Sequence, residues 1–300
     1  MSKIPYQKKP LTFNEQVDLL KERGMLIDDD KKAIYHLSSI GYYRLSAYWH
    51  PFRIRKDNQI LDNFKPDTYW QQVIELYEFD RELRLLVMDA IERIEVTIRT
   101  QITYKLSHQY DAFFYLEEKY FHSKFKHLEW LKHISKEIDY SKDTFITHFN
   151  KKYKDKKPPI WMATEVISLG KLSKLYSGLK NEDKRLVSNF FDIPWQRLKS
   201  WLHVVAYIRN VCAHHSRLWN RELSIRANDS KDNEWLTPIT PRNDRIFYVL
   251  LILRFLMKRS NNGEDWRQKI NELLKQFENN EDALKMMGVP NNWQEHPIWK

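Results

Sequence analysis

Apolar residues recur every three or four positions along most of the chain, which is the spacing of one face of an α-helix. The longest such stripe contains Val87, Ile91, Ile94, Ile98 and Ile102. It predicts a helix from about residue 67 to about residue 106, in one piece or in two. The other face of this helix carries charged residues that we expect to be solvated: Asp80, Arg84, Glu92 and Arg99.

Shorter helical patterns precede the long stripe. The first follows a helix cap at Thr12 or Asn14. The second covers residues 31–49 and is interrupted near Gly41. Residues 55–67 are polar and lie between two helical patterns, so they predict a loop or a short hairpin.

The second half of the chain is also helical in pattern. A helix that starts near Pro194 has an apolar face formed by Leu198, Trp201, Leu202, Val205, Ile208 and Cys212. Residues 244–257 predict a buried helix and residues 266–277 an amphipathic one. With only 6 Gly and no internal repeat, the sequence predicts an all-α protein. We expect a single compact unit over residues 1–300, with N-terminal helices (1–116), a Lys-rich middle insertion (117–158) and a helical core (159–300).

The middle region differs in composition from the rest. Residues 117–158 hold 11 Lys, no Arg, seven acidic residues and four His. One interpretation is a solvated, partly mobile insertion. The other is an arm that follows a phosphate backbone, using a group of lysines at its end: Lys151, Lys152, Lys154, Lys156 and Lys157.

The net charge, the cysteine count and the lack of targeting signals indicate the kind of partner and the cellular compartment. A formal net charge of +10 and a pI near 9.3 favour an anionic partner. The one cysteine, Cys212, excludes an internal disulfide. The N-terminus lacks the apolar core of a signal peptide, and the longest apolar run, residues 247–257, is too short to cross a bilayer. We therefore expect a cytoplasmic protein without membrane contact.

The densest run of chemically capable side chains covers residues 209–221. It contains Arg209, Asn210, His214 and His215. A guanidinium and an amide can hold a phosphate, and an imidazole can transfer a proton near neutral pH. An Arg followed by His after four to six residues is the minimal pattern of one class of metal-independent RNases. With 19 Arg and 11 His in the chain, about 2 matches arise by chance, and Arg44 with His50 and Arg197 with His203 also match.

Helical geometry distinguishes the Arg209 match from the other two. On a helix, His203, Tyr207, Asn210 and His214 form one polar stripe opposite the apolar face. The stripe indicates either a catalytic site or a buried polar network that only satisfies backbone groups. No phosphate-binding loop, nucleophile elbow or zinc-protease motif is present. We therefore expect neither a metal nor another cofactor.

Several separated motifs resemble a known family. The chain is similar, over nearly its whole length, to the Abi-like family of bacterial abortive-infection proteins, the AbiD and AbiF group. The matching segments are LLKERG at 19–24, YYRLSAY at 42–48, FDRELR at 79–84, IERIE at 91–95, WMA at 161–163, the run at 209–221, and MGVP at 287–290 with Trp293, Pro297 and Trp299.

The resemblance implies both a fold and a function. The family is counted within the HEPN superfamily, which implies a helical bundle, an Arg-x4–6-His RNase site, and a role in phage defence or as a toxin. Arg209, Asn210 and His214 match the site motif, with His215 as the alternative histidine. The AbiF branch is associated with a noncoding RNA. We expect a metal-independent HEPN endoribonuclease associated with such an RNA. The alternative is a catalytically inactive protein that assembles on a structured noncoding RNA.

Two further expectations concern assembly and RNA binding. One Arg–His set supplies few groups for both acid and base roles, so we expect a homodimer whose Arg209–His214 helices face each other in a shared cleft. Arg217 and Arg221 form a second candidate RNA-binding surface beside the Lys151–Lys157 group, because planar guanidinium groups stack or bind bidentately.

Overall fold

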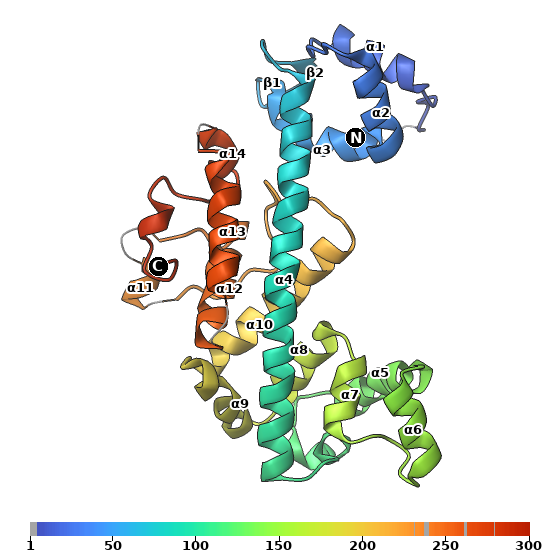
Figure 1. The fold of residues 1–300 in the computed structure, drawn as a ribbon, viewed down its shortest axis with the longest axis vertical. Coiled ribbons are helices and arrows are strands. Elements are labelled where there is room, and N and C mark those ends of the chain that lie inside the picture. The colour runs from blue at the N-terminus through green and yellow to red at the C-terminus, as the bar shows by residue number, and fades with distance from the viewer. Residues whose placement is uncertain (1–4, 231, 237–239, 261–262, 279) are drawn as a thin grey trace. The chain divides into compact units, whose positions relative to one another are not determined.

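The computed structural model describes residues 5–300, apart from 231, 237–239, 261–262 and 279. This part of the chain contains fourteen α-helices, short 3-10 turns and one two-stranded hairpin, so the all-α class is confirmed. The chain divides into two compact units, residues 1–82 and 83–300. Helix α4 (Trp70–Gln109) contributes residues to both units (Figure 1). The division at 116 and 158 that the sequence suggested stays a prediction.

The first unit starts with three short helices. They are α1 (Phe13–Glu22), α2 (Asp30–Ile40) and α3 (Tyr42–Trp49). Thr12, one of the two predicted caps, begins α1 in a capping box: its hydroxyl accepts from the Glu15 N–H while the Glu15 carboxylate accepts from the Thr12 N–H. Gly41 separates α2 from α3 with φ 92°, a conformation that other residues rarely adopt.

A hairpin follows α3, which is one of the two alternatives predicted for residues 55–67. Strands β1 (Arg53–Lys56) and β2 (Gln59–Phe64) pair antiparallel. The two residues between them, Asp57 and Asn58, have φ of 49° and 61°. Positive φ at both central positions is the geometry that matches the twist of a two-residue hairpin.

Helix α4 is continuous over 40 residues, so the alternative of two pieces is wrong. The expectation of a solvated charged face is also wrong for two of its four residues, since Asp80 is 0% and Arg84 6% exposed. The Tyr48 hydroxyl donates a 2.6 Å hydrogen bond to the Asp80 carboxylate. Burial of a carboxylate costs less free energy when a donor such as this hydroxyl binds it. The spacing of apolar residues alone does not reveal that donor.

The Lys-rich region is helical and belongs to the second unit. After the 3-10 turn Phe114–Leu116 that precedes it, the region forms a second 3-10 turn (Glu118–Tyr120), α5 (His127–Tyr140) and α6 (Thr144–Lys152). These two helices bury their apolar sides, which consist of Trp130, Ile134, Ile138, Ile146 and Phe149. The stretch is therefore packed, and its lysines lie on the outer faces of α5 and α6 and in the segments beside these helices.

The remaining helices complete the second unit. They are α7 (Ile160–Val166), α8 (Leu169–Gly178), α9 (Asn181–Ser188), α10 (Trp195–Ala213), α11 (Asn233–Leu236), α12 (Ile246–Arg259), α13 (Glu264–Lys275) and α14 (Glu281–Lys285). Every residue of α12 from 246 to 257 is buried, as its apolar pattern predicts.

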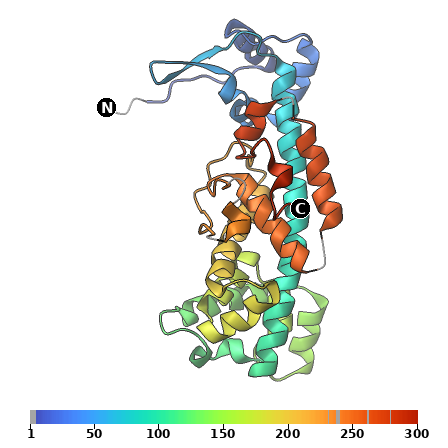
Figure 2. The same ribbon diagram turned by 90° about the vertical axis from the view of Figure 1, so that its left-hand side faces the viewer.

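Helix α13 lies along α4 in both ribbon views (Figures 1 and 2). The Trp266 indole donates to the Leu86 carbonyl at 2.7 Å, and Arg93 binds both carboxylate oxygens of Asp265 at 3.0 Å. No helix in the described part of the chain is long and apolar enough to span a membrane.

Candidate nucleic-acid site on helix α10

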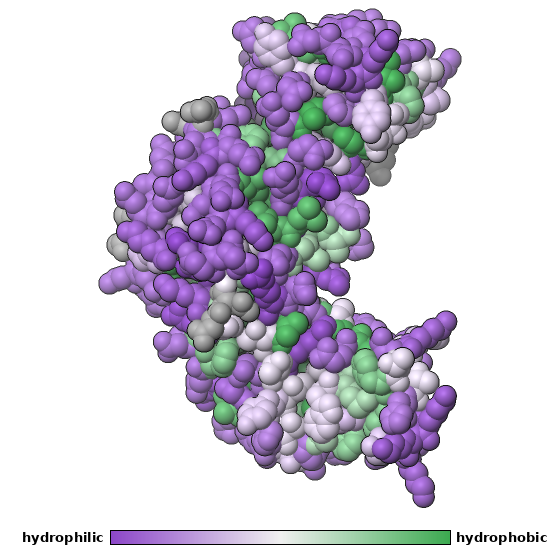
Figure 3. All heavy atoms as spheres, viewed as in Figure 1, coloured by the Kyte–Doolittle hydropathy of each residue, from purple (hydrophilic) through white to green (hydrophobic). Residues whose placement is uncertain are grey.

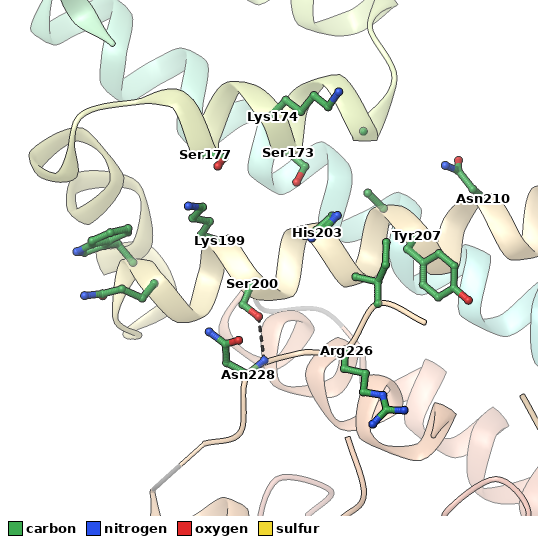
Figure 4. Close-up of a pocket in the computed structure, with 15 residues that line it drawn as sticks. Ser173, Lys174, Ser177, Lys199, Ser200, His203, Tyr207, Asn210, Arg226 and Asn228 are labelled. Atoms are coloured by element: carbon green, nitrogen blue, oxygen red, sulfur yellow. Dashed lines mark hydrogen bonds between the residues drawn. The ribbon is translucent and has the colours of Figure 1, made fainter. Parts of the chain in front are cut away.

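Helix α10 carries the predicted polar stripe on the side opposite the core. It begins directly after Pro194, and its predicted apolar residues are all buried. His203, Tyr207 and Asn210 all line a groove with a volume of about 750 Å³ (Figure 4). The structure therefore brings three of the four stripe residues to one surface. The fourth, His214, is the C-cap residue of the helix and is exposed.

The end of α10 places both histidines outside the regular helix. The Ser216 N–H donates to the Val211 carbonyl at 3.0 Å, and the His215 N–H donates to the Cys212 carbonyl at 2.9 Å. This pair of bonds is a Schellman motif, in which His215 takes the left-handed position with φ 54°. Glycine is the usual residue there. A histidine at this position is a strained choice, and strain of this kind is found preferentially at functional sites.

Arg209 is not among the residues that line the groove, although its neighbour Asn210 is. Its charge acts on Glu95 of α4, and its guanidinium makes a long 3.4 Å hydrogen bond to the Asn210 amide oxygen. Burial raises the pKa of Glu95 above its usual range, although the charges of Arg99 and Arg209 both act to lower it. No hydrogen bond joins the side chains of Arg209 and His214 among the residues that the structure describes. Arg209 and Asn210 thus contact each other, and His214 follows them at the exposed end of the same helix.

Glu95 belongs to an ion network that fixes α4 against α7. Arg99 pairs with Glu95 on α4, and its guanidinium also lies 3.6 Å from the Glu165 carboxylate of α7. Arg99 further donates to the Ile167 carbonyl at 3.1 Å. The Glu95–Arg99 pair follows from the helix itself, because residues four apart on a helix are neighbours. No pattern in the sequence pointed to an effect of Arg209 on Glu95.

Arg221, a predicted RNA-binding residue, supports the stripe from the following loop. Burial acts to raise the pKa of Tyr207, but hydrogen bonds with Ser224 and Arg221 outweigh it and lower that pKa. The Arg221 Nε atom also donates to the Arg217 carbonyl at 2.6 Å. Both arginines are half-buried, and Arg221 lies next to Tyr207 of the stripe.

The predicted lysine group lies at the end of α6 and in the segment that follows it. Lys151, Lys152, Lys154 and Lys156 are exposed. Lys157 instead binds Asp139 of α5 at 2.6 Å, with 19% of its side chain exposed. Four of the five lysines are therefore accessible to a polyanion, and the fifth holds the segment against α5.

The two competing Arg–His pairs occupy different surroundings. Arg44 and His50 lie in the first unit, on α3 and the 3-10 turn after it. Arg197 is bound to the Asp232 carboxylate and lies over the Trp201 ring, 5.9 Å from its centroid. Its partner His203 nevertheless lines the groove.

Helix α8, the first half of α10 and the loop after α10 supply groove residues that the sequence pattern did not indicate. These are Ser173, Lys174, Ser177, Lys199, Ser200, Arg226 and Asn228. They come from three separate segments, and no spacing along the chain brings them together. Among the described residues, no group of three or more His, Cys, Asp or Glu side chains is arranged to hold a metal ion.

Fold and site together define a helical protein with an Arg-x4-His motif at the end of a groove-lining helix. A family model described as Abi-like protein matches residues 35–220, which is more than half of the chain and includes Arg209, Asn210 and His214. The chain belongs to the family of Abi-like proteins. Membership implies a role in abortive infection, a form of defence against phage. No curated protein and no solved structure matches the chain.

Proposed function

We propose that this Abi-like protein is a metal-independent endoribonuclease that acts at the C-terminal end of α10. The observation that carries the proposal is the common location of Asn210 in the groove, Arg209 beside it, and two exposed histidines at the end of the same helix. A guanidinium and an amide bind a phosphate, and an exposed imidazole exchanges protons with a substrate at neutral pH.

The reaction follows from the groups present. The ribose 2′-oxygen attacks the adjacent phosphorus while His214 or His215 accepts the proton of the 2′-hydroxyl. The bond between phosphorus and the 5′-oxygen breaks, and that oxygen receives a proton. The products are a 2′,3′-cyclic phosphate and a 5′-hydroxyl. Arg209 stabilises the negative charge that develops on the phosphate oxygens, and Asn210 orients the phosphate.

The 5′-oxygen needs a group that donates a proton to it, and in this proposal a second copy of the chain supplies that group. We infer a homodimer in which two Arg209–His214 ends share one cleft. Leu85, Val96 and Tyr104 of α4 are 58%, 54% and 62% exposed, and Val96 adjoins Glu95, the partner of Arg209. Hydrophobic colour lies over the middle of α4 within a mainly hydrophilic face (Figure 3). Exposed apolar side chains beside a site favour an interface there. Light scattering that shows only monomer, with and without RNA, contradicts this part of the proposal.

Four variants test the nuclease. Arg209→Ala and His214→Ala are expected to reduce cleavage by the purified protein by about 10²–10⁴-fold, the usual contribution of one acid–base group. Arg81→Ala on α4 and His133→Ala on α5 are controls, because both side chains are exposed and lie outside the groove. The controls are expected to cleave like the natural chain.

The same variants distinguish the non-catalytic alternative. If RNA co-purifies with the protein while Arg209→Ala and His214→Ala leave toxicity and RNA integrity unchanged, the chain is an RNA-binding protein that assembles on a structured noncoding RNA. Sequencing the co-purified RNA then identifies that partner.

A further inference from the structure

The groove over α10 is elongated, and its walls come from two other segments. Helix α10 forms the floor, α8 forms one wall with Ser173 and Ser177 facing the floor, and residues 225–228 form the other wall (Figure 4). Lining residues on α10 extend from Trp195 to Asn210. At 1.5 Å per residue, the floor is about 22 Å long. One end of the groove therefore lies at the proposed active site, and the other lies at the start of α10.

All charged residues that line the groove are cations. They are Lys174, Lys199 and Arg226, and the lining contains no carboxylate. Arg226 is paired with Glu222 at 2.6 Å, just outside the groove. Lys174 and Lys199 are exposed, and neither has an ion-pair partner among the residues that the structure describes. Two uncompensated ammonium groups thus face the same groove.

A third lysine adds positive charge at the Trp195 end. Lys184 of α9 is 3% exposed, and its ammonium lies 4.8 Å from the centroid of the Trp195 ring. No carboxylate in the described part of the chain forms an ion pair with it. Burial and the charge of Lys199 lower the pKa of Lys184 to about 8, and they outweigh the opposite effect of the Asp183 carboxylate. Like charges held together in this way favour an anion between or beside them.

We propose that this groove binds a short single-stranded segment of RNA adjacent to the phosphate that is cleaved. In this arrangement Lys174 and Lys199 bind backbone phosphates, and the groove-facing side of Trp195 is a surface for a base. The proposal rests on the proposed function for the identity of the polymer and for the position of the cut at Asn210.

Size and chemistry favour an unpaired strand over other ligands. The volume of about 750 Å³ is that of a pocket for a small molecule, which corresponds to about two to four nucleotides. An A-form duplex presents phosphates on a surface too wide for such a groove, and its bases are not free to stack on a side chain. The hydroxyls of Ser173 and Ser177 supply hydrogen bonds that do not depend on base identity.

Binding is measured with a probe that resists cleavage by 2′-hydroxyl attack. The probe is a fluorescent, unstructured 2′-O-methyl oligoribonucleotide, compared with the same strand in a blunt duplex. The Lys174→Gln/Lys199→Gln variant is compared with Lys132→Gln/Lys136→Gln, which removes the same charge from exposed positions on α5. All variants are full-length chains, and circular dichroism confirms their helical content.

The expected result is tighter binding of the single strand than of the duplex by the natural chain. Loss of Lys174 and Lys199 is expected to weaken binding about tenfold and to reduce the log–log salt slope by about 1.4, which corresponds to two phosphate contacts on single-stranded nucleic acid. The α5 control is expected to retain both affinity and slope. Absence of binding by the natural chain, a preference for duplex, or equal losses in both variants overturns the proposal.

The result separates this inference from the proposed nuclease. If the groove variant loses binding of the probe but the natural chain cleaves no RNA, the groove stands and the nuclease fails. If the natural chain cleaves RNA and the groove variant has the same KM, the nuclease stands and the groove fails.

Discussion

Comparison of His215→Gly with His215→Ala isolates the cost of the backbone conformation at the end of α10, because both variants remove the imidazole and its interactions. His215 has φ 54° and holds the left-handed position of the Schellman motif. A side chain with a Cβ atom costs about 1–2 kcal/mol in this conformation. Glycine avoids that cost but loses about 0.5–1 kcal/mol of backbone entropy on folding. We therefore expect the second unit of His215→Gly to be more stable than that of His215→Ala by about 0.5–1 kcal/mol.

The assay is thermal or urea unfolding followed by circular dichroism. For a unit of this size, the expected gain corresponds to an increase in Tm of about 1–4 °C. His215→Ala is the matched control, because it removes the imidazole and keeps a Cβ atom in the left-handed conformation. His215→Asn is expected to fall between the two, since asparagine tolerates this conformation better than most residues.

Two outcomes of the His215 experiment test the argument about the backbone conformation. A glycine variant that is more stable but cleaves RNA less well shows that histidine is kept for function at a cost in stability. If His215→Gly instead destabilises the protein by 1 kcal/mol or more while His215→Ala does not, the backbone argument is wrong.

Three further predictions follow from single features of the structure. Glu95 has a raised pKa in the folded chain, so its contribution to stability is fully present below its usual pKa and is lost as the pH rises through the raised value. The stability of Glu95→Gln relative to the natural chain should therefore increase as the pH rises above the usual pKa of glutamate, and a difference that does not change with pH contradicts the assignment. Gly178→Ala should destabilise the second unit by about 1–3 kcal/mol in urea, because a Cβ atom would lie 2.6 Å from the Phe125 ring, and unchanged stability shows that the ring moves freely. Joint replacement of the exposed lysines near the end of α6 together with Lys157 should weaken RNA binding for many sequences and flatten its salt dependence, whereas unchanged affinity places RNA elsewhere.

Most of the helices follow from periodicity because each buries one continuous apolar stripe. The stripe that begins at Val87 is an example. The all-round apolar sequence of α12 and the cap at Thr12 were equally visible in the sequence. Burial of the charged residues Asp80 and Arg84 does not follow from that pattern. Their burial depends on partners that tertiary packing supplies, such as the Tyr48 hydroxyl, which precedes Asp80 by 32 residues.

The candidate site could also be predicted only in part from the sequence. Helical geometry placed His203, Tyr207 and Asn210 on one surface, because residues three and four apart share a face. The position of Lys174 opposite α10 depends on the packing of α8, which no local pattern in the sequence specifies. The left-handed conformation of His215 was also not predicted, since glycine, the usual signal for it, is absent.

The chemistry of the RNA ends tests the central claim most directly. Purified protein is incubated with RNA in EDTA, and the termini of any fragments are identified by mass spectrometry. Attack by the 2′-hydroxyl at the end of α10 predicts 2′,3′-cyclic phosphate and 5′-hydroxyl ends, with cleavage unaffected by EDTA and lost in His214→Ala/His215→Ala. Fragments with 3′-hydroxyl and 5′-phosphate ends, or loss of cleavage on chelation, contradict the account.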